Sequence, residues 1–465
     1  MELPKPRFVP PLDESFRPAV LAQTTFERAA AAAGGQVLAL AVERTEGHVS
    51  RFETVVLPPG HPDFADNLWF VERLAKFLLW QRGGWRLHVG GPPAIGAHLA
   101  AHYRPDGPRA FDADLMGRQV YGRPFEVVVS DLGAVPPASE TTQALGRHLD
   151  GCRIGFDLGA SDRKSSAVID GAAVFSVEVP WDPRRFSNPQ AHFDGINDSL
   201  KRAAEHLPRV DAIGGSAAGI YVDNQVRVGS LYRGVAPADF EARVKDLFLQ
   251  LKAAWGGVPF EVVNDGEVTA LAGSMSLGVN GILGVALGSS EAGGYVTPAG
   301  TITDWLNELA FCPVDYSPTA PVDEWSGDAG CGVQYFSQQA VGRLIPVAGL
   351  PIDPELALPE QLLAVQAAMA AGDRRAAAIY ETLGIYLGYG LAHYATFYEL
   401  QHVLVLGRVT SGPGGEILVE RAQAVLAAEF PELAQRLAVG LPDEQSRRVG
   451  QAIAAASLPR IDGGP

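Results

Sequence analysis

Cysteine is scarce in this sequence, and long apolar runs are missing. The 465 residues include only Cys152, Cys312 and Cys331, too few for a disulfide framework and in keeping with a reducing compartment. No stretch approaches the roughly 18 apolar residues of a membrane span. The first residues, MELPKPRFVPPLDESF, carry proline and charge where a signal peptide would be apolar. We therefore expect a cytoplasmic protein with no membrane partner.

Positive charge is also in short supply. Lys and Arg number 37 against 53 Asp and Glu, which gives a net charge of −16. Residues 1–150 hold 15 basic and 17 acidic residues, so this third carries −2 and the remainder −14. Binding to DNA requires a basic stripe that neutralises phosphates. The charge balance predicts no nucleic-acid partner and argues against an N-terminal DNA-reading domain.

The hydrophobic share of 47% and the charged share of 19% are typical of a folded globular protein. A chain of this length is too long for one ordinary core. A stretch rich in Pro, Ser and Thr at residues 132–150 marks a boundary. Before it, the patterns predict a mixed α/β region of unknown role. Strands are predicted at 36–44, 51–58 and 123–131, and an amphipathic helix at 67–80. Strands therefore precede the first long helix in this prediction.

After the boundary, strands and helices alternate before a helical C-terminal half. Strands are predicted at 154–160, 165–170 and 211–220, with a helix at 198–207, and further strands at 261–265 and 282–288. Alternation of this kind favours an α/β architecture in which helices cover the sheets.

The first motif with chemical meaning is IGFDLGASDRKSSAVID, residues 154–170. A strand delivers Asp157, and Gly159 and Ser161 lie in a tight turn before the next strand. Backbone N–H groups of such a turn can bind phosphate, Asp157 can hold Mg²⁺ through water, and Lys164 can balance phosphate charge. An ordinary β-hairpin with a glycine turn would give the same pattern.

The second motif is VPFEVVNDGEVTALAGS, residues 258–274, in which a strand ends at Asn264 and Asp265 before a helix of small residues. A carboxylate at the end of a strand is well placed to accept a proton from a substrate hydroxyl. Alternatively, either residue is a helix N-cap.

Two further segments each contain a glycine turn. Residues 281–296 join two strands through Gly288 and Ser289, which could form a second phosphate-binding hairpin. Residues 402–426 give a strand, a turn at Gly407 and a helix. Each of these segments also fits an ordinary connection, so the order of all four motifs carries more weight than any single one.

In this order, the four segments resemble the phosphate-1, catalytic, phosphate-2 and adenosine motifs of the ROK family. That family comprises bacterial sugar kinases and sugar-responsive repressors of the actin, hexokinase and Hsp70 superfamily. The resemblance covers roughly residues 151–457. It implies an α/β, two-lobed actin-like ATPase (ribonuclease H-like) fold, with residues 1–150 as an additional N-terminal α/β region, 151–275 as the first lobe and 276–465 as the second.

The resemblance also implies roles for individual residues. Asp265 matches the catalytic base, and Asp157 the aspartate associated with Mg²⁺. The substrate-binding positions fall on Asn264, Ser230 and Glu308. The positions for ATP and its phosphates are Gly159, Ser161, Lys164, Gly288, Ser289 and Gly407. The implied ligands are ATP with Mg²⁺ and a sugar or polyol. The resemblance does not fix the oligomeric state, and a homodimer is one of the alternatives.

Departures from the family pattern concentrate where its zinc loop lies. Phe311 stands at the zinc-binding histidine, Glu324 and Ser326 stand at the first two cysteines, and Cys331 alone is kept. Because one thiol cannot build a tetrahedral zinc site, we predict no structural zinc.

Two further departures affect the nucleotide motifs. Arg408 replaces the second glycine of the adenosine motif, and Glu291 interrupts the second hairpin. An anionic Glu291 would repel a triphosphate unless its side chain points away. The sequence therefore favours an ATP-dependent sugar kinase, with a catalytically degraded sugar- or nucleotide-binding regulator as the alternative. A repressor is disfavoured because residues 1–150 lack a basic reading head.

Overall fold

The computed structural model describes residues 3–140, 145–442 and 444–461. The chain forms two compact units. Unit 1 comprises Met1–Thr141, Val285–Gly293 and Trp305–Leu441, and unit 2 comprises Thr142–Gly284, Gly294–Asp304 and Pro442–Pro465. None of the helices within those described ranges combines the length and apolarity needed to cross a bilayer. The domain boundaries expected from the sequence, at residues 150 and 275, stay predictions.

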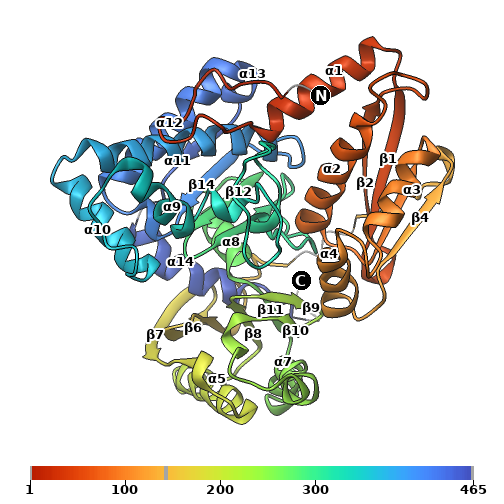
Figure 1. Cartoon of the computed structure of the whole chain (residues 1–465). Helices are drawn as coiled ribbons and strands as arrows, with labels where there is room; N and C mark the ends of the chain where they lie inside the picture. The colour runs from red at the N-terminus through yellow and green to blue at the C-terminus, as the bar shows by residue number, and fades with distance from the viewer. Residues whose placement is uncertain (1–2, 141–144, 443, 462–465) are drawn as a thin grey trace. The chain divides into compact units, whose positions relative to one another are not determined.

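The N-terminal part of unit 1 is built on a four-stranded sheet of order β2-β1-β3-β4, coloured red to orange in Figure 1. Strand β1 pairs antiparallel with β2 and β3, and β3 pairs parallel with β4. The strands are β1 (Gln36–Glu43), β2 (Val49–Val56), β3 (Arg86–Gly90) and β4 (Glu126–Ser130), and the helices are α1 (Ala19–Ala32), α2 (Asp66–Arg82), α3 (Pro93–His102) and α4 (Ala110–Asp114).

Two expectations for this region are wrong. Strands do not precede the first long helix, because α1 comes before β1; its sequence, AVLAQTTFERAAAA, has high helix propensity but few large apolar residues to mark a period. Helix α2 is not amphipathic in its surroundings. Its charged residues Glu72, Arg73 and Lys76 are buried along with its apolar ones.

The second sheet has the order β13-β12-β14-β15. Its strands are β12 (Ile282–Leu287), β13 (Glu291–Val296), β14 (His402–Leu406) and β15 (Ala438–Gly440), and the helices of this part are α9 (Gln338–Ala348), α10 (Leu358–Ala370), α11 (Arg374–Tyr394), α12 (Pro413–Glu429) and α13 (Pro431–Ala434). Helices α11 and α12 pack side by side, in blue in Figure 1. Their close approach requires Gly388, where an added Cβ would lie 2.6 Å from Cβ of Val425.

Unit 2 contains a five-stranded sheet of order β11-β8-β5-β6-β7. Strands β11, β8 and β5 run parallel, and β6 and β7 continue the sheet antiparallel. The strands are β5 (Cys152–Leu158), β6 (Asp162–Ile169), β7 (Ala172–Pro180), β8 (Ala212–Ala217) and β11 (Phe260–Asn264), with a separate hairpin of β9 (Ile220–Val222) and β10 (Gln225–Val228). The strands and helices predicted after the boundary are confirmed as elements.

The helices of unit 2 are α5 (Pro189–Ala204), α6 (Pro237–Asp239), α7 (Leu247–Ala254), α8 (Asp265–Leu277) and α14 (Glu444–Ala456). Phe156, Leu200, Ile213, Phe248 and Phe260 belong to one buried core between sheet and helices. This core fixes the three parallel strands, and with them the residues that follow their carboxyl ends.

Candidate functional site

The carboxyl ends of β5, β8 and β11 bring polar side chains together in unit 2. In the sheet register, Asp157 on β5 lies opposite Ser216 on β8, and Ser216 lies opposite Val263 on β11. The hydroxyl of Ser216 donates to Oδ1 of Asp157 at 2.6 Å. Asp265 follows directly as the first residue of α8. Ligands of open α/β sheets bind outside the carboxyl ends of the strands, so this edge is the candidate site.

The turn between β5 and β6 is tight and is held by a hydrogen bond from Trp181. The amide of Gly159 donates to the carbonyl of Asp162 at 2.9 Å, and the indole N–H of Trp181 donates to the carbonyl of Gly159 at 2.8 Å. Nζ of Lys164 lies 3.1 Å from Oδ1 of Asp162 and 3.8 Å from Oδ2 of Asp157. The cation therefore lies at the turn beside these two carboxylates, and its phosphate-binding role stays a prediction.

Ser161, the other turn residue of the prediction, is exposed, and its hydroxyl donates to Oδ2 of Asp162 at 2.9 Å. Ser230 begins the short 3₁₀ turn Ser230–Tyr232 and is partly buried. Within the described ranges, no hydrogen bond joins Ser230 to Asp157 or Asp265, so its substrate-binding role stays a prediction.

Asn264 and Asp265 have different roles. Asn264 is the N-cap of α8: its Oδ1 accepts from the amide of Gly266 at 2.8 Å, and its Nδ2 donates to the carbonyl of Gly219 at 2.7 Å. The cap alternative therefore applies to Asn264, and Oδ1 of Asp265 also accepts from the Gly266 amide at 3.0 Å. Asp265 is partly buried, and burial, with the nearby charge of Asp157, raises its pKa to about 6. A carboxylate with a pKa close to neutral is suited to accept a proton.

Two residues that lie at this edge of the sheet, Ser216 and Tyr221, were not identified from the sequence. Ser216 positions Asp157, and its only signal was its place near the end of an apolar strand. Tyr221 lies near Asp265: burial raises the pKa of Tyr221 well above its usual value, and the Asp265 charge adds to the rise. Its hydroxyl donates to the carbonyl of Ala218 at 3.2 Å.

Unit 1 holds the second predicted hairpin and the adenosine turn. The amide of Gly288 donates to the carbonyl of Ser290 at 2.9 Å, and Ser289 is exposed at the tip. Gly407 has φ 96°, and a Cβ there would lie 2.3 Å from the carbonyl oxygen of Leu287. Only glycine fits this position, so the turn after β14 lies directly against the strand that leads into the hairpin.

Glu291 points away from the hairpin surface. It is 2% exposed, and its Oε1 accepts from the Tyr394 hydroxyl at 2.8 Å. Burial raises the pKa of Glu291 to about 8, and the charge of Glu308 adds to the rise. Glu291 is therefore protonated at neutral pH, which removes the repulsion of a triphosphate considered above.

Glu308, the predicted sugar-binding glutamate, lies on a segment held by α2. Its amide donates to the carbonyl of Trp80 at 3.1 Å, and the amide of Asn307 donates to the carbonyl of Gln81 at 2.9 Å. The Tyr398 hydroxyl donates to Oδ1 of Asn307 at 2.8 Å. The C-terminal turn of α2 thus uses its unpaired carbonyl groups to fix the backbone of Glu308.

The segment that matches the zinc loop contains apolar and hydrogen-bonded contacts. The Phe311 ring lies 4.5 Å from that of Trp80 and 4.7 Å from that of Trp325, between centroids. The amide and hydroxyl of Ser326 both donate to Oδ2 of Asp323. Cys331 is fully buried. Over the described part of the chain, no group of three or more His, Cys, Asp and Glu residues is placed to hold a metal ion.

No protein-family model matches the chain, and no curated protein matches it. Among solved structures, a ROK hexokinase from Thermus thermophilus aligns with a TM-score of 0.51 and 20% identity over 65% of this chain and 97% of the hexokinase. A ROK family transcriptional regulator, a homolog of the E. coli MLC protein, aligns with a TM-score of 0.53 and 18% identity over 67% of this chain and 79% of the regulator.

These likenesses define the class of fold. The chain has the α/β, two-lobed actin-like ATPase fold that the ROK sugar kinases have, which confirms the fold expected from its motifs. More particularly, the two solved structures named above are a ROK hexokinase and a ROK family transcriptional regulator.

Proposed function

We propose that this protein is a divergent ROK-like carbohydrate kinase, which transfers a phosphoryl group from ATP to a hydroxyl of a sugar or polyol in the cytoplasm. The observation that carries the proposal is Asp265, a partly buried carboxylate whose pKa is raised to about 6, directly after β11 and near Asp157. The likeness to the Thermus hexokinase supports the same activity.

In this proposal, Asp265 accepts the proton of the attacking hydroxyl, while backbone amides and cations bind the phosphates. Gly159 and Ser161 belong to the first phosphate hairpin, and Lys164 offsets phosphate charge. Gly288 and Ser289 form the second hairpin, and Gly407 forms the turn for adenosine. Glu308, Asn264 and Ser230 are the proposed contacts to the acceptor, although Asn264 already uses both polar atoms of its amide within the protein.

Asp157 fits the proposed Mg²⁺. One of its oxygens accepts from Ser216, and the other lies 3.8 Å from Lys164 and is open to further partners. Mg²⁺ typically binds one or two carboxylates together with water and substrate phosphates, so a dedicated cluster of protein ligands is not required. The ion would neutralise charge on the phosphates during transfer.

A second candidate function is a regulator that binds sugar or nucleotide without phosphorylating it. Arg408 favours it, because it replaces the second glycine of the adenosine motif. The likeness to a ROK transcriptional regulator concerns the fold, whereas the near-neutral charge of residues 1–150 argues against DNA binding.

The test is release of ADP from ATP and Mg²⁺ across a panel of monosaccharides, amino sugars and polyols. With any accepted substrate, Asp265→Asn should lower turnover by about 10²–10⁴-fold, the usual contribution of general-base catalysis. Folding should be unaffected, because Asn264 caps the helix. Asp223→Asn, in the exposed β9–β10 turn, is the matched control and should keep full turnover. Equal turnover of both variants would remove the assignment of Asp265, and no turnover with any acceptor would favour the regulator.

A further inference from the structure

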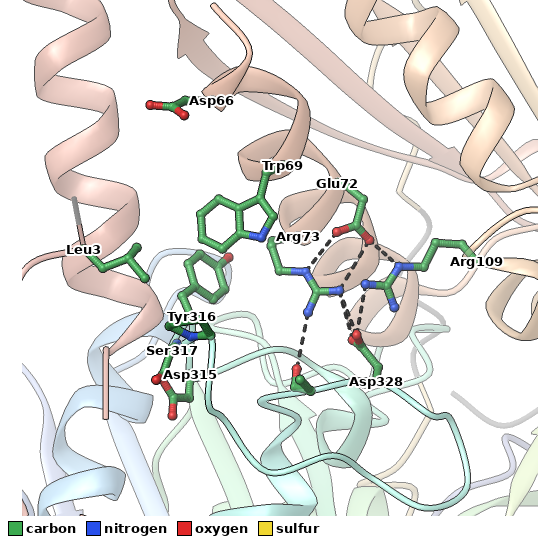
Figure 2. Close-up of a pocket in the computed structure, with 12 residues that line it drawn as sticks. Leu3, Asp66, Trp69, Glu72, Arg73, Arg109, Asp315, Tyr316, Ser317 and Asp328 are labelled. Carbon is green, nitrogen blue, oxygen red and sulfur yellow. Dashed lines mark hydrogen bonds and ion pairs between the residues drawn. The ribbon is translucent and has the colours of Figure 1, made fainter. Parts of the chain in front are cut away.

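Six charged side chains form a buried network in unit 1, part of which is drawn in Figure 2. Three come from α2, two from the segment around α4, and one from the loop that matches the zinc loop. Every one has a side chain that is at most 11% exposed. The residues are Glu72, Arg73, Lys76, Arg109, Asp112 and Asp328.

Asp328 is the centre of this network. Its Oδ1 lies 3.0 Å from Nη2 of Arg73 and 3.0 Å from Nη2 of Arg109, and its Oδ2 lies 3.1 Å from Nζ of Lys76. Although burial alone would raise the pKa of Asp328, the charges of Arg73 and Lys76 lower it. Asp328 is therefore an anion bound by three cations.

The remaining carboxylates balance the charge. Glu72 pairs with Arg73 at 3.0 Å and with Arg109, and Asp112 pairs with Lys76 at 3.2 Å. Three cations thus meet three carboxylates. The outer side of the network lines a cavity of about 600 Å³. Removing one member would leave the buried charges of the network unbalanced, which is destabilising.

The network contacts Cys331, the last residue of the segment that corresponds to the family's zinc loop. The thiol of Cys331 donates to the carbonyl of Asp328 at 3.8 Å, and Arg73 donates to the carbonyl of Ala329 at 3.3 Å. The loop also closes on itself, because the amide of Asp323 donates to the carbonyl of Asp328 at 2.8 Å. The loop is therefore anchored through its own backbone and through Asp328.

Helix α2 connects this anchor to the proposed substrate segment. One turn after Lys76, the carbonyl of Trp80 accepts from the amide of Glu308, while the Trp80 indole donates to Asp112 at 2.7 Å. The ring of Trp80 also contacts Phe311, which stands at the zinc-binding histidine of the family pattern. One rigid helix thus holds both the loop and Glu308.

We propose that α2 of the N-terminal region takes the structural place of a zinc ion: Arg73 and Lys76 anchor the 323–331 loop through Asp328 and are positioning residues for Glu308. The anchoring stands on the contacts above, and only the effect on acceptor binding rests on the proposed kinase function.

The anchoring is tested by the rate at which a thiol reagent labels Cys331, followed by peptide mass spectrometry. Burial raises the pKa of this thiol to about 12, so the anchored loop should label slowly, with or without EDTA. Asp328→Asn and Lys76→Met should increase the rate at least about tenfold, because each removes the contacts between Asp328 and Lys76 and leaves the buried charges of the network unbalanced. Arg86→Met is the matched control, since Arg86 pairs with Glu126 on the sheet and is 29% exposed; it should label like the wild type.

Several outcomes would overturn the proposal. If EDTA alone accelerates labelling of the wild type, a metal holds the loop. If Asp328→Asn labels as slowly as the wild type, the network does not anchor it. Should Lys76→Met fail to fold, the nearly isosteric Asp328→Asn and the wild-type EDTA comparison still decide the matter.

The proposed effect on acceptor binding is tested with any acceptor that the kinase screen finds. Asp328→Asn should raise KM for the acceptor by up to about 100-fold, the usual cost of a displaced positioning group, while KM for ATP stays unchanged. Equal changes in both constants would contradict a positioning role. If the wild type phosphorylates nothing, the proposed function fails, and the labelling experiment still tests the anchor.

Discussion

Replacing Glu291 with glutamine should make the protein more stable above neutral pH. Burial raises the pKa of Glu291 from 4.5 to about 8. Between these two values, the unfolded chain loses the proton and the folded chain keeps it, so stability falls as pH rises. At about 1.4 kcal/mol for each pKa unit, the wild type loses at most about 5 kcal/mol between pH 4.5 and pH 8.

Glutamine is neutral at every pH and can still accept a hydrogen bond from Tyr394, which now donates to Oε1 of Glu291. The variant should therefore lack this loss. Urea unfolding of both proteins at a series of pH values from 5 to 9 gives the free energy of unfolding, and the difference between them isolates the one carboxyl group. We expect that difference to move in favour of Glu291→Gln as pH rises.

Glu432→Gln, at an exposed position of the same unit, is the control and should follow the wild type at all pH values. Parallel profiles for wild type and Glu291→Gln would refute the reasoning. They would mean that Glu291 is ionised in the folded protein, and the repulsion of a triphosphate at the second hairpin would again have to be considered.

Three further predictions concern the site, the packing and the partners. For an accepted substrate, kcat/KM should fall about tenfold for each pH unit below about 6 and level off above it, because protonated Asp265 cannot accept a proton; a flat profile down to pH 5 would contradict this. Gly332→Ala should destabilise the protein by about 1–3 kcal/mol in thermal unfolding, since the new Cβ would lie 2.6 Å from the carbonyl oxygen of Leu309. A gel shift at low salt should detect no binding of duplex DNA by the full chain, because residues 1–150 lack a phosphate-neutralising stripe.

The strands that carry the proposed catalytic groups could be predicted from the sequence because local signals agree there. Asp157 lies near the end of an apolar strand and Asp265 directly follows one, and the ROK order of motifs pointed to both. The turn at Gly407 was also predictable, because a glycine directly after an apolar strand indicates a turn, and the backbone there does require glycine. These features depend on residues that are neighbours in the chain.

The network around Asp328 could not be predicted in the same way. Lys76 lies on a helix of alternating charged and apolar residues, which typically means a solvated face, and its partner Asp328 is more than 250 positions away along the chain. Nothing local distinguishes a buried cation from an exposed one. Helix α1 was missed for another reason, since its alanines give no strong period.

The packing of α2 bears on where this chain can be divided. Phe77 of α2 stacks on Phe397 with ring centroids 4.0 Å apart, and the thiol of Cys312 donates to the carbonyl of Phe77 at 3.7 Å. A fragment that begins at residue 151 would keep all four ROK-like motifs but would expose these apolar surfaces to water. Such a fragment would tend to aggregate, and the N-terminal region would have to be supplied as a separate chain to cover them. The apolar packing within unit 1 therefore joins residues from both sides of position 151.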